Sequence, residues 1–122
     1  MKKLRIILVE DEPLISIYFA ELLEEMGNEV SAIETTESAA VAAAARLKPD
    51  LMIVDVHLIE GNGIAAVARI LKDGFVPHIF TTGDRLVKGE VGPDAIILQK
   101  PFLDSALTKA IEAALLAKAA HG

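Results

Sequence analysis

The chain alternates short apolar segments with longer segments of helical period. The apolar segments are residues 4–9, 28–33, 51–54, 77–81 and 95–98. Two of them, 6–9 and 51–54, show no polar alternation, which is typical of strands that are covered on both faces. We therefore predict five short strands, at least two of them buried on both sides.

The segment after the first predicted strand has the apolar spacing of a helix. It opens with Pro13, which suits the first turn of a helix, and Gly27 is placed to end it. Between them the apolar residues recur at three or four positions, as expected for one buried face. These residues are Ile15, Phe19, Leu22 or Leu23, and Met26.

Three further segments are predicted to be helical. Residues 38–48 are rich in alanine and stop before Pro49, and residues 64–73 stop before Gly74. A proline restricts the residue before it, so Pro49 marks a helix end. The last helix should begin near residue 102 or 103. Its apolar residues recur at steps of four: Leu103, Leu107, Ile111 and Leu115.

Strand and helix in alternation favour parallel βαβ units with right-handed crossovers. The predicted fold class is α/β, a doubly wound open sheet of five parallel strands. The segment 83–94 interrupts the repeat, because it holds three glycines and a proline and its apolar residues form no stripe. We expect a loop or a single helical turn there, with the fourth helix of the fold degraded or missing.

Composition narrows the class of protein. The 122 residues are 52 % hydrophobic and include no cysteine, which excludes disulfides, thiolate zinc sites and a cysteine nucleophile. A net charge of −6 disfavours the wrapping of nucleic acid. The first apolar segment is too short for a membrane span. We expect a soluble cytoplasmic protein with a single domain over residues 1–122 and no output domain.

Polar side chains stand where the predicted strands end. They are Glu10 and Asp11 after the first, Asp55 after the third, Thr81 and Thr82 at the end of the fourth, and Lys100 after the fifth. In open α/β sheets the carboxyl ends of the strands form the edge where function gathers. Clustered carboxylates suit Mg²⁺, which prefers oxygen ligands. An aspartate can also accept a phosphoryl group, whose charge a lysine and a hydroxyl would stabilise.

These motifs together resemble the response-regulator receiver domain, the phosphoacceptor module of bacterial two-component signalling. The resemblance covers nearly the whole chain and implies a flavodoxin-like sheet with strand order 2-1-3-4-5. Its motifs stand in order at the ends of four predicted strands. They are Glu10-Asp11, Asp55 after Leu-Met-Ile-Val, Thr82-Gly83, and Lys100-Pro101-Phe102.

The resemblance implies a role for the residues that handle the phosphoryl group. Asp55 would accept it from a histidine of a sensor kinase or phosphotransfer protein, Thr82 would hydrogen-bond it, and Lys100 would pair with it. Alternation does not decide between Thr81 and Thr82, and we choose Thr82 because the small Gly83 follows. The Lys100-Pro101 bond would be cis, as in the family. The product would be a conformational signal to a partner protein or onward phosphotransfer, without turnover catalysis, nucleic-acid binding or membrane insertion.

The resemblance also implies a magnesium site. Asp11 and Asp55 would bind Mg²⁺ directly, Glu10 would bind it through water, and the backbone carbonyl of His57 would complete the protein ligands. The His57 side chain would face solvent beside the site. Since side chains two places beyond the aspartate and the threonine lie near the phosphoryl group in receivers, we predict that His57 and Asp84 modulate the lifetime of the acyl phosphate.

Some positions depart from the usual receiver pattern. Ile97 stands where the family has an aromatic residue three places before the lysine, and Ile59 stands where a proline is common. The sequence Phe-Thr-Thr-Gly at residues 80–83 is similar to the Phe-Ala-Thr-Gly of an atypical receiver subgroup. That similarity implies a stand-alone or stress-signalling receiver of alphaproteobacteria, paired with an unusual class of histidine kinases.

Simpler interpretations stay open for single motifs. Glu10 and Asp11 could be a solvated helix start, Asp55 a cap and Lys100 a surface charge. Two other function classes compete with the receiver. A phosphatase of the haloacid dehalogenase type would carry Asp-x-Asp-x-Thr after the first strand, which Glu-Asp-Glu-Pro-Leu does not match. A phosphorylation-independent interaction module would not need the intact acids and lysine.

Overall fold

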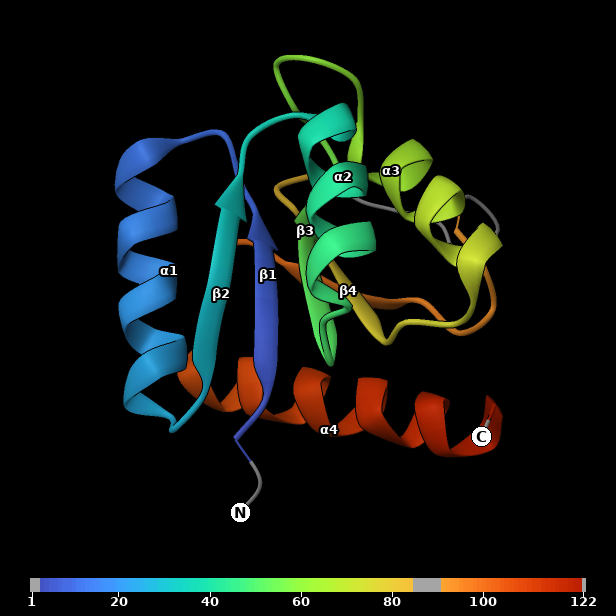
Figure 1. Cartoon of the computed structure of the whole chain (residues 1–122). Coiled ribbons are helices and arrows are strands. Elements are labelled where there is room, and N and C mark those ends of the chain that lie inside the picture. Colours follow the sequence, from blue (N-terminus) through green and yellow to red (C-terminus); the bar gives the residue numbers. More distant parts are fainter. Residues whose placement is uncertain (1–2, 85–90, 122) are drawn as a thin grey trace.

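The protein forms one five-stranded sheet covered by helices on both faces (Figure 1). The structure is a computed structural model and describes residues 3–84 and 91–121. All strand pairs are parallel and follow the order β2-β1-β3-β4-β5, so the predicted α/β class and strand order are confirmed. The strands are β1 (Arg5–Val9), β2 (Glu29–Glu34), β3 (Leu51–Asp55), β4 (His78–Thr82) and β5 (Ile96–Gln99). The helices are α1 (Pro13–Glu25), α2 (Glu37–Leu47), α3 (Gly63–Ile70), the short 3₁₀ helix η1 (Leu71–Asp73) and α4 (Asp104–His121).

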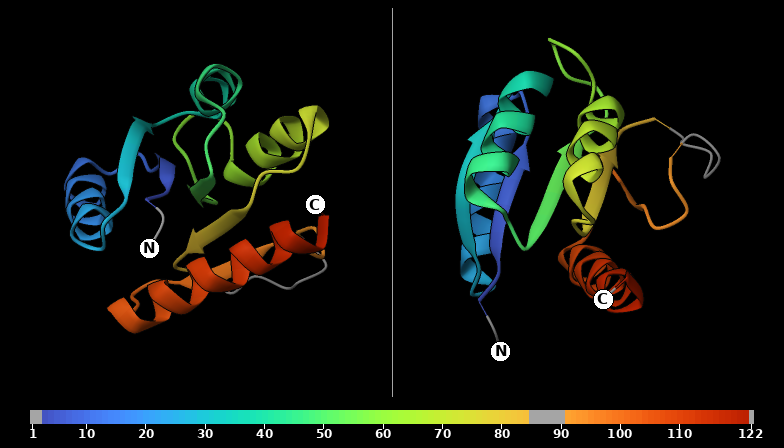
Figure 2. Two further views of the ribbon diagram at one scale, coloured as in Figure 1. Left: turned by 60° about the horizontal axis from the view of Figure 1, so that its bottom comes forward. Right: turned by 45° about the vertical axis from the view of Figure 1, so that its right-hand side comes forward.

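The sheet separates two apolar layers, because successive side chains of a strand point to opposite faces. Ile6 and Leu8 belong to the layer under α1 and α4, whereas Ile7 and Val9 belong to the layer under α2 and α3. Figure 2 shows these helices on either side of the strands. Every residue of β3 is buried, and so is β1 from Ile6 onward, as the missing polar alternation indicates. This central pair of strands leads directly into the acidic residues.

Glycine and proline delimit the helices as expected. Pro13 occupies the first turn of α1, and Gly27 follows the helix with φ +94°, a conformation that favours glycine. Gly74 ends η1 with φ +125°. Helix α2 stops at Leu47, one residue before the left-handed Lys48 and two before Pro49.

The predicted buried faces of the first and last helices are partly wrong. Leu103 lies before the start of α4 and is 76 % exposed, and the buried face of that helix is Leu107, Ala110, Ile111 and Ala114. Ile15 is 36 % exposed, and Ser16 takes a buried position beside it. A helix turns 3.6 residues at a time, so a stripe at steps of four drifts off the buried face, and small residues next to it fill the contact.

The connection between β4 and β5 differs from the other crossovers. Its described residues, 83–84 and 91–95, contain no helix, and the predicted loop or single turn otherwise concerns residues 85–90, which lie outside the described residues. Of the helices that the structure describes, none has the length and apolarity that crossing a membrane requires. The carboxyl ends of β1, β3, β4 and β5 meet at one edge of the sheet, and the described part of this connection places no helix over it.

Candidate functional site

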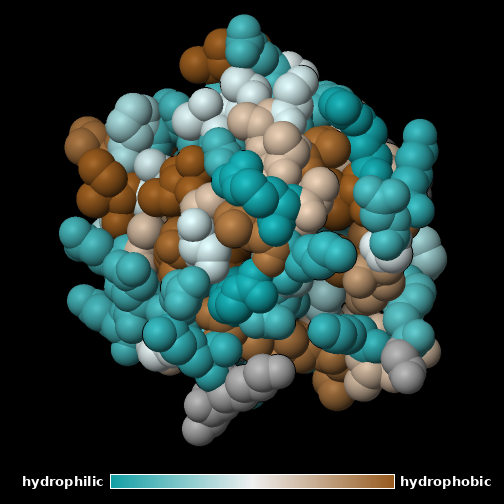
Figure 3. All heavy atoms as spheres, viewed as in Figure 1, coloured by the Kyte–Doolittle hydropathy of each residue, from teal (hydrophilic) through white to brown (hydrophobic). Residues whose placement is uncertain are grey.

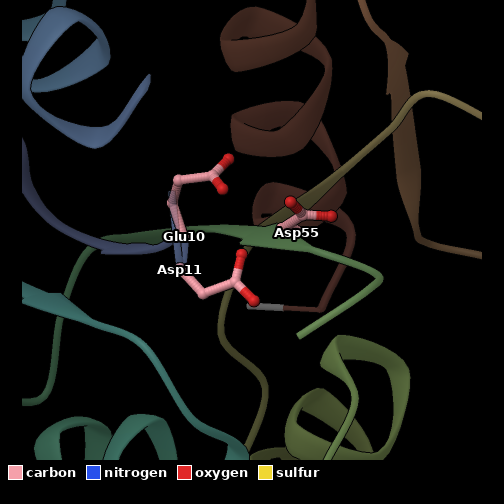
Figure 4. A group of neighbouring side chains, drawn as sticks. All are labelled: Glu10, Asp11 and Asp55. Carbon is pink, nitrogen blue, oxygen red and sulfur yellow. The ribbon is translucent and has the colours of Figure 1, made fainter. Parts of the chain in front are cut away.

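Three carboxylates gather at the carboxyl edge of the sheet. Glu10 and Asp11 directly follow β1, Asp55 is the last residue of β3, and the two strands are hydrogen-bonded neighbours. One carboxylate oxygen from each lies within 4.8 Å of the others, and Figure 4 shows the three side chains together. Glu10 is 1 % exposed and Asp55 is 8 % exposed, while Asp11 is half-buried. Three acids at this spacing need a positive partner, because buried charges are costly when unpaired.

Lys100 supplies one positive charge to this cluster. Its Nζ donates to Glu10 Oε1 at 2.9 Å and to Asp55 Oδ2 at 3.0 Å. The Lys100 side chain is 22 % exposed, so it closes the cluster from the side of β5. Its backbone N–H donates to the carbonyl oxygen of Thr82, and the Lys100-Pro101 bond is cis, as the resemblance implies.

Burial and the neighbouring charges have opposite effects on the pKa values of Glu10 and Lys100. Burial raises the pKa of Glu10, although the hydrogen bonds from Lys100 and from the Glu12 N–H oppose the rise. For Lys100, burial by itself would lower the pKa, but the hydrogen bonds to Glu10 and Asp55 outweigh it and the pKa is raised. Lys100 is therefore a cation at neutral pH, held between two buried acids.

The loop between β3 and α3 donates backbone amides to two of the carboxylates. The N–H of His57 donates to Asp55 Oδ1 at 3.0 Å, and the N–H of Ile59 donates to Asp11 Oδ2 at 2.7 Å. The role of Ile59 was not predicted from the sequence, because its donor is a backbone N–H, which every residue except proline has. These bonds fix the orientation of both carboxylates without neutralising their charge.

Gly63, the first residue of α3, packs against the backbone of Asp55. A methyl group added there would collide with the Asp55 carbonyl oxygen and would lie 2.8 Å from Val54 Cγ1. The Gly63 N–H donates to the carbonyl of Val56 at 2.9 Å. Only glycine fits this close approach of the helix start to the end of β3. A glycine at a helix start is the one trace that this contact leaves in the sequence, and it was not predicted.

The two threonines of β4 are both buried. Thr81 is paired in register with Asp55, and Thr82 lies one residue further along the strand. The Thr82 hydroxyl accepts from the N–H of Asp84 at 3.0 Å. In the part of the chain that the structure describes, no hydrogen bond joins either hydroxyl to Asp55, so the choice of Thr82 stays a prediction.

His57 and Asp84 meet beside the site. His57 Nε2 lies 2.8 Å from Asp84 Oδ2, and the two side chains are 67 % and 73 % exposed. The histidine side chain faces solvent, as predicted, while its backbone N–H is turned toward Asp55. This pair links the loop after β3 to the end of β4, a contact that was not predicted.

The donor set fits a hard divalent cation. Three carboxylates carry a formal charge of −3, and Lys100 offsets one unit, so negative charge remains at the cluster. Mg²⁺ binds through one or two carboxylates and keeps several waters, which suits a cluster at a sheet edge with a half-buried Asp11. A carboxylate beside such a cation and a lysine is also equipped to receive a phosphoryl group.

Comparison with known proteins gives a consistent result. A family model described as "Response regulator receiver domain" matches residues 6–112. The phyllosphere-induced regulator PhyR of Methylorubrum extorquens is 36 % identical over 114 residues, which are 90 % of this chain and 43 % of that protein. The transcriptional regulatory protein PdtaR of Mycobacterium tuberculosis is 34 % identical over 115 residues, 91 % of this chain and 56 % of that protein. The chain thus spans about half the length of these curated relatives.

Solved structures agree with the sequence relatives. The solution structure of the PhyR receiver domain of Erythrobacter litoralis is 34 % identical, with a TM-score of 0.84 over 95 % of this chain and 92 % of that one. The crystal structure of PhyR from Brucella abortus is 35 % identical, with a TM-score of 0.87 over 98 % of this chain and 51 % of that one. The predicted similarity to an atypical subgroup is confirmed, since the relatives include PhyR proteins in both comparisons.

Proposed function

Since the chain belongs to the response-regulator receiver family of two-component signalling, we propose that Asp55 is its phosphoacceptor and that Mg²⁺ assists the transfer. Asp11 and Asp55 would hold the ion directly, Glu10 through water, and His57 through its backbone carbonyl. The bound ion would neutralise charge on the phosphoryl oxygens.

The observation that carries the proposal is the set of contacts made by Asp55. Its Oδ1 accepts from the His57 N–H, and its Oδ2 accepts from Lys100 Nζ. The carboxylate is thereby oriented at both oxygens and lies among the acids that suit a cation. A helix cap at Asp55, or a solvated helix start at Glu10 and Asp11, would not require Lys100 to lie between Glu10 and Asp55.

In the proposed transfer an Asp55 oxygen attacks the phosphorus of a phosphohistidine. The phosphorus–oxygen bond to Asp55 forms, the phosphorus–nitrogen bond breaks, and the histidine leaves with its nitrogen lone pair. Lys100 already lies within hydrogen-bonding distance of Asp55 Oδ2, so its ammonium can pair with a phosphoryl oxygen after a small shift. Thr82 would hydrogen-bond the same group. These residues assist one transfer and the later hydrolysis, and we propose no turnover catalysis.

The surface beside Lys100 supports docking of a protein donor. Leu14, Ile17 and Tyr18 on α1 are 82 %, 54 % and 64 % exposed, and Leu103 before α4 is 76 % exposed. A groove of about 410 Å³ between these elements is lined by Tyr18 and Lys100 among others. Figure 3 shows apolar side chains over α1 on the left of the molecule. A sensor histidine kinase or a phosphotransfer protein is the proposed donor for this surface.

We also propose the extent of the domain, its cellular compartment and the type of signal that it passes on. We propose a single receiver domain over residues 1–122 that works in the cytoplasm and passes a conformational signal or the phosphoryl group to a partner protein. The names of its relatives, PhyR and PdtaR, are those of regulators. Another PhyR of solved structure, 35 % identical to this chain, is named a stress response regulator, which supports a stress-signalling role.

The test is intact mass spectrometry after incubation with acetyl phosphate and Mg²⁺. We expect one phosphoryl adduct that requires Mg²⁺ and is lost in Asp55→Asn. The matched control is Asp73→Asn, an exposed aspartate of η1, which should leave the adduct unchanged. An adduct that persists in Asp55→Asn would refute the assignment. If acetyl phosphate is silent, titration with beryllium fluoride decides, and no binding would favour the interaction-module alternative.

A further inference from the structure

The loop that orients Asp11 and Asp55 is anchored to α2. Residues 56–62 leave the end of β3 and return to α3, and Figure 1 shows this loop beyond the strand ends, next to the start of α2. One part of the loop, His57 and Ile59, donates to the two carboxylates. The other part, residues 60–62, contacts the first turn of α2. The position of the donors therefore depends on what holds residues 60–62.

Glu37, the first residue of α2, makes most of these anchoring contacts. Its backbone N–H donates to the carbonyl of Glu60, and its Oε1 accepts from the N–H of Asn62, both at 3.1 Å. Thr36, just before it, forms a parallel bridge with Glu60. The Glu37 side chain is only 21 % exposed, although it is charged and lies at the surface.

The anchor also reaches α3. Arg69 Nη1 donates to Glu37 Oε2 at 3.1 Å, so one carboxylate joins α2, the loop and α3. Gly61 has φ +81°, and a methyl group on it would collide with the Glu37 side chain. The Asn62 N–H and the Arg69 guanidinium hold the pKa of Glu37 below its ordinary value, so the group is ionised at neutral pH.

Asn62 transmits this anchor to the site. It forms an antiparallel bridge with His57, and its side chain caps α3 by accepting from the N–H of Ala65 at 2.7 Å. The next residue, Gly63, is the one that packs on the Asp55 carbonyl. A displacement of Asn62 would thus move both the His57 amide and the start of α3 relative to Asp55.

We propose that Glu37 is a positioning residue for the cation and phosphoryl site, acting through the loop 56–62. The carboxylate fixes Asn62, and the Glu37 backbone N–H holds Glu60. The loop then presents the His57 and Ile59 amides, and these orient Asp55 and Asp11. The proposal rests on the proposed function, because it concerns the magnesium affinity of that same site. Removal of outer partners of metal ligands weakens binding by about 10- to 100-fold, and Glu37 acts one step further out, so we expect a loss of about 5-fold.

The experiment is a Mg²⁺ titration of the full chain, followed by amide chemical shifts. Glu37→Ala loses both side-chain contacts, whereas Glu37→Gln keeps an acceptor for the Asn62 N–H and loses the ion pair with Arg69. We expect Mg²⁺ affinity to fall most in Glu37→Ala and less in Glu37→Gln, and the Ile59 amide to shift in Glu37→Ala before any Mg²⁺ is added. Glu21→Ala, which removes an exposed glutamate of α1, controls for the loss of one negative charge.

The outcomes separate the two proposals. Unchanged Mg²⁺ affinity in Glu37→Ala, with weakened binding in Asp55→Asn, would overturn the role of Glu37 and leave the proposed function intact. A lowered thermal midpoint with unchanged affinity would show a structural role only and would also overturn it. Absence of Mg²⁺ binding to the natural sequence would overturn both. If Glu37→Ala does not fold, Arg69→Ala provides the same test, with an expected loss smaller than that predicted for Glu37→Ala.

Discussion

Two loops leave the sheet edge beside Asp55, and they are held very differently. The loop 56–62 after β3 is bound at both ends, to Asp11 and Asp55 on one side and to Glu37 on the other. In the described part of the β4–β5 connection, residues 83–84 and 91–95, the backbone N–H bonds are local, from Asp84 to Thr82 and from Ala95 to Gly92. Its longer-range bonds are exposed side-chain pairs, His57 with Asp84 and His121 with Asp94. The first loop is a scaffold that defines the acidic cluster. The second, in its described part, makes its longer-range hydrogen bonds through exposed side chains and makes no hydrogen bond to the three carboxylates.

The largest expected effect comes from removing the positive charge of Lys100, which joins the end of β5 to Glu10 and Asp55. Lys100→Met leaves Glu10 and Asp55 buried without a cation, and breaking a buried pair costs about 3–5 kcal/mol, less here because Lys100 is partly exposed. We expect unfolding free energy to fall by about 2 kcal/mol in buffer without Mg²⁺ and to recover partly when Mg²⁺ is added. Urea denaturation measures both.

The matched control for this variant is Lys109→Met, which removes an exposed lysine of α4. It should change the unfolding free energy by less than about 0.5 kcal/mol. Equal effects of the two substitutions would show that Lys100 has no special pairing with the acids.

A pair of glycines sharpens the comparison between the loops. Gly63→Ala should destabilise the protein by about 2 kcal/mol and weaken Mg²⁺ binding, because the added methyl group meets the Asp55 carbonyl and overpacking costs about 1–3 kcal/mol. Gly92→Ala adds the same methyl group in the β4–β5 connection, where no described atom lies within 4 Å, and should be close to neutral. Thermal unfolding and Mg²⁺ titration of both variants test this. A neutral Gly63→Ala would contradict the scaffold role of the first loop.

The smallest expected effect concerns the contact between the two loops. His57 and Asp84 are mostly exposed, and such pairs contribute about 0–1 kcal/mol to stability. We expect His57→Ala and Asp84→Ala to leave the unfolding free energy nearly unchanged but to alter the dephosphorylation rate several-fold. The reason is that the His57 N–H donates to Asp55 and the Asp84 N–H donates to the Thr82 hydroxyl, so both residues adjoin the proposed phosphoryl site. The decay of the mass adduct in each single variant and in the double variant measures the rate. Identical decay in all four proteins would remove this hypothesis.

The sequence was informative where side chains carry the signal. The strands were predictable because Ile6, Leu8 and Ile53 belong to uninterrupted apolar runs. Glu10, Asp55 and Lys100, which the structure brings together, could be singled out because each charge lies at or just beyond the end of a predicted strand. The helix faces were less predictable, because Leu103 has the residue type of a core position and yet lies outside α4.

The remaining features depend on contacts that residue type does not reveal. Ile59 holds Asp11 through its backbone N–H, which any residue except proline provides. A glutamate such as Glu37 is common in the first turn of a helix, so its residue type does not signal a special role. Its contact with Asn62 joins residues 25 positions apart. Leu14 and Ile17 on α1 are apolar and yet exposed, so hydropathy alone does not distinguish them from the buried Phe19.

The hydrogen bonds of Lys100 join residues separated by 90 and 45 positions along the chain. Glu10 follows β1 and Lys100 follows β5, so the site exists only when both strands are in place. A ligand that binds only this arrangement therefore stabilises the folded state of the whole domain. At 100 times its dissociation constant it would add about 2.7 kcal/mol to global stability. Slowed hydrogen exchange at buried Ile6, near the end of β1 opposite the acids, would then report occupancy at Asp55, because core strands open only with the whole domain.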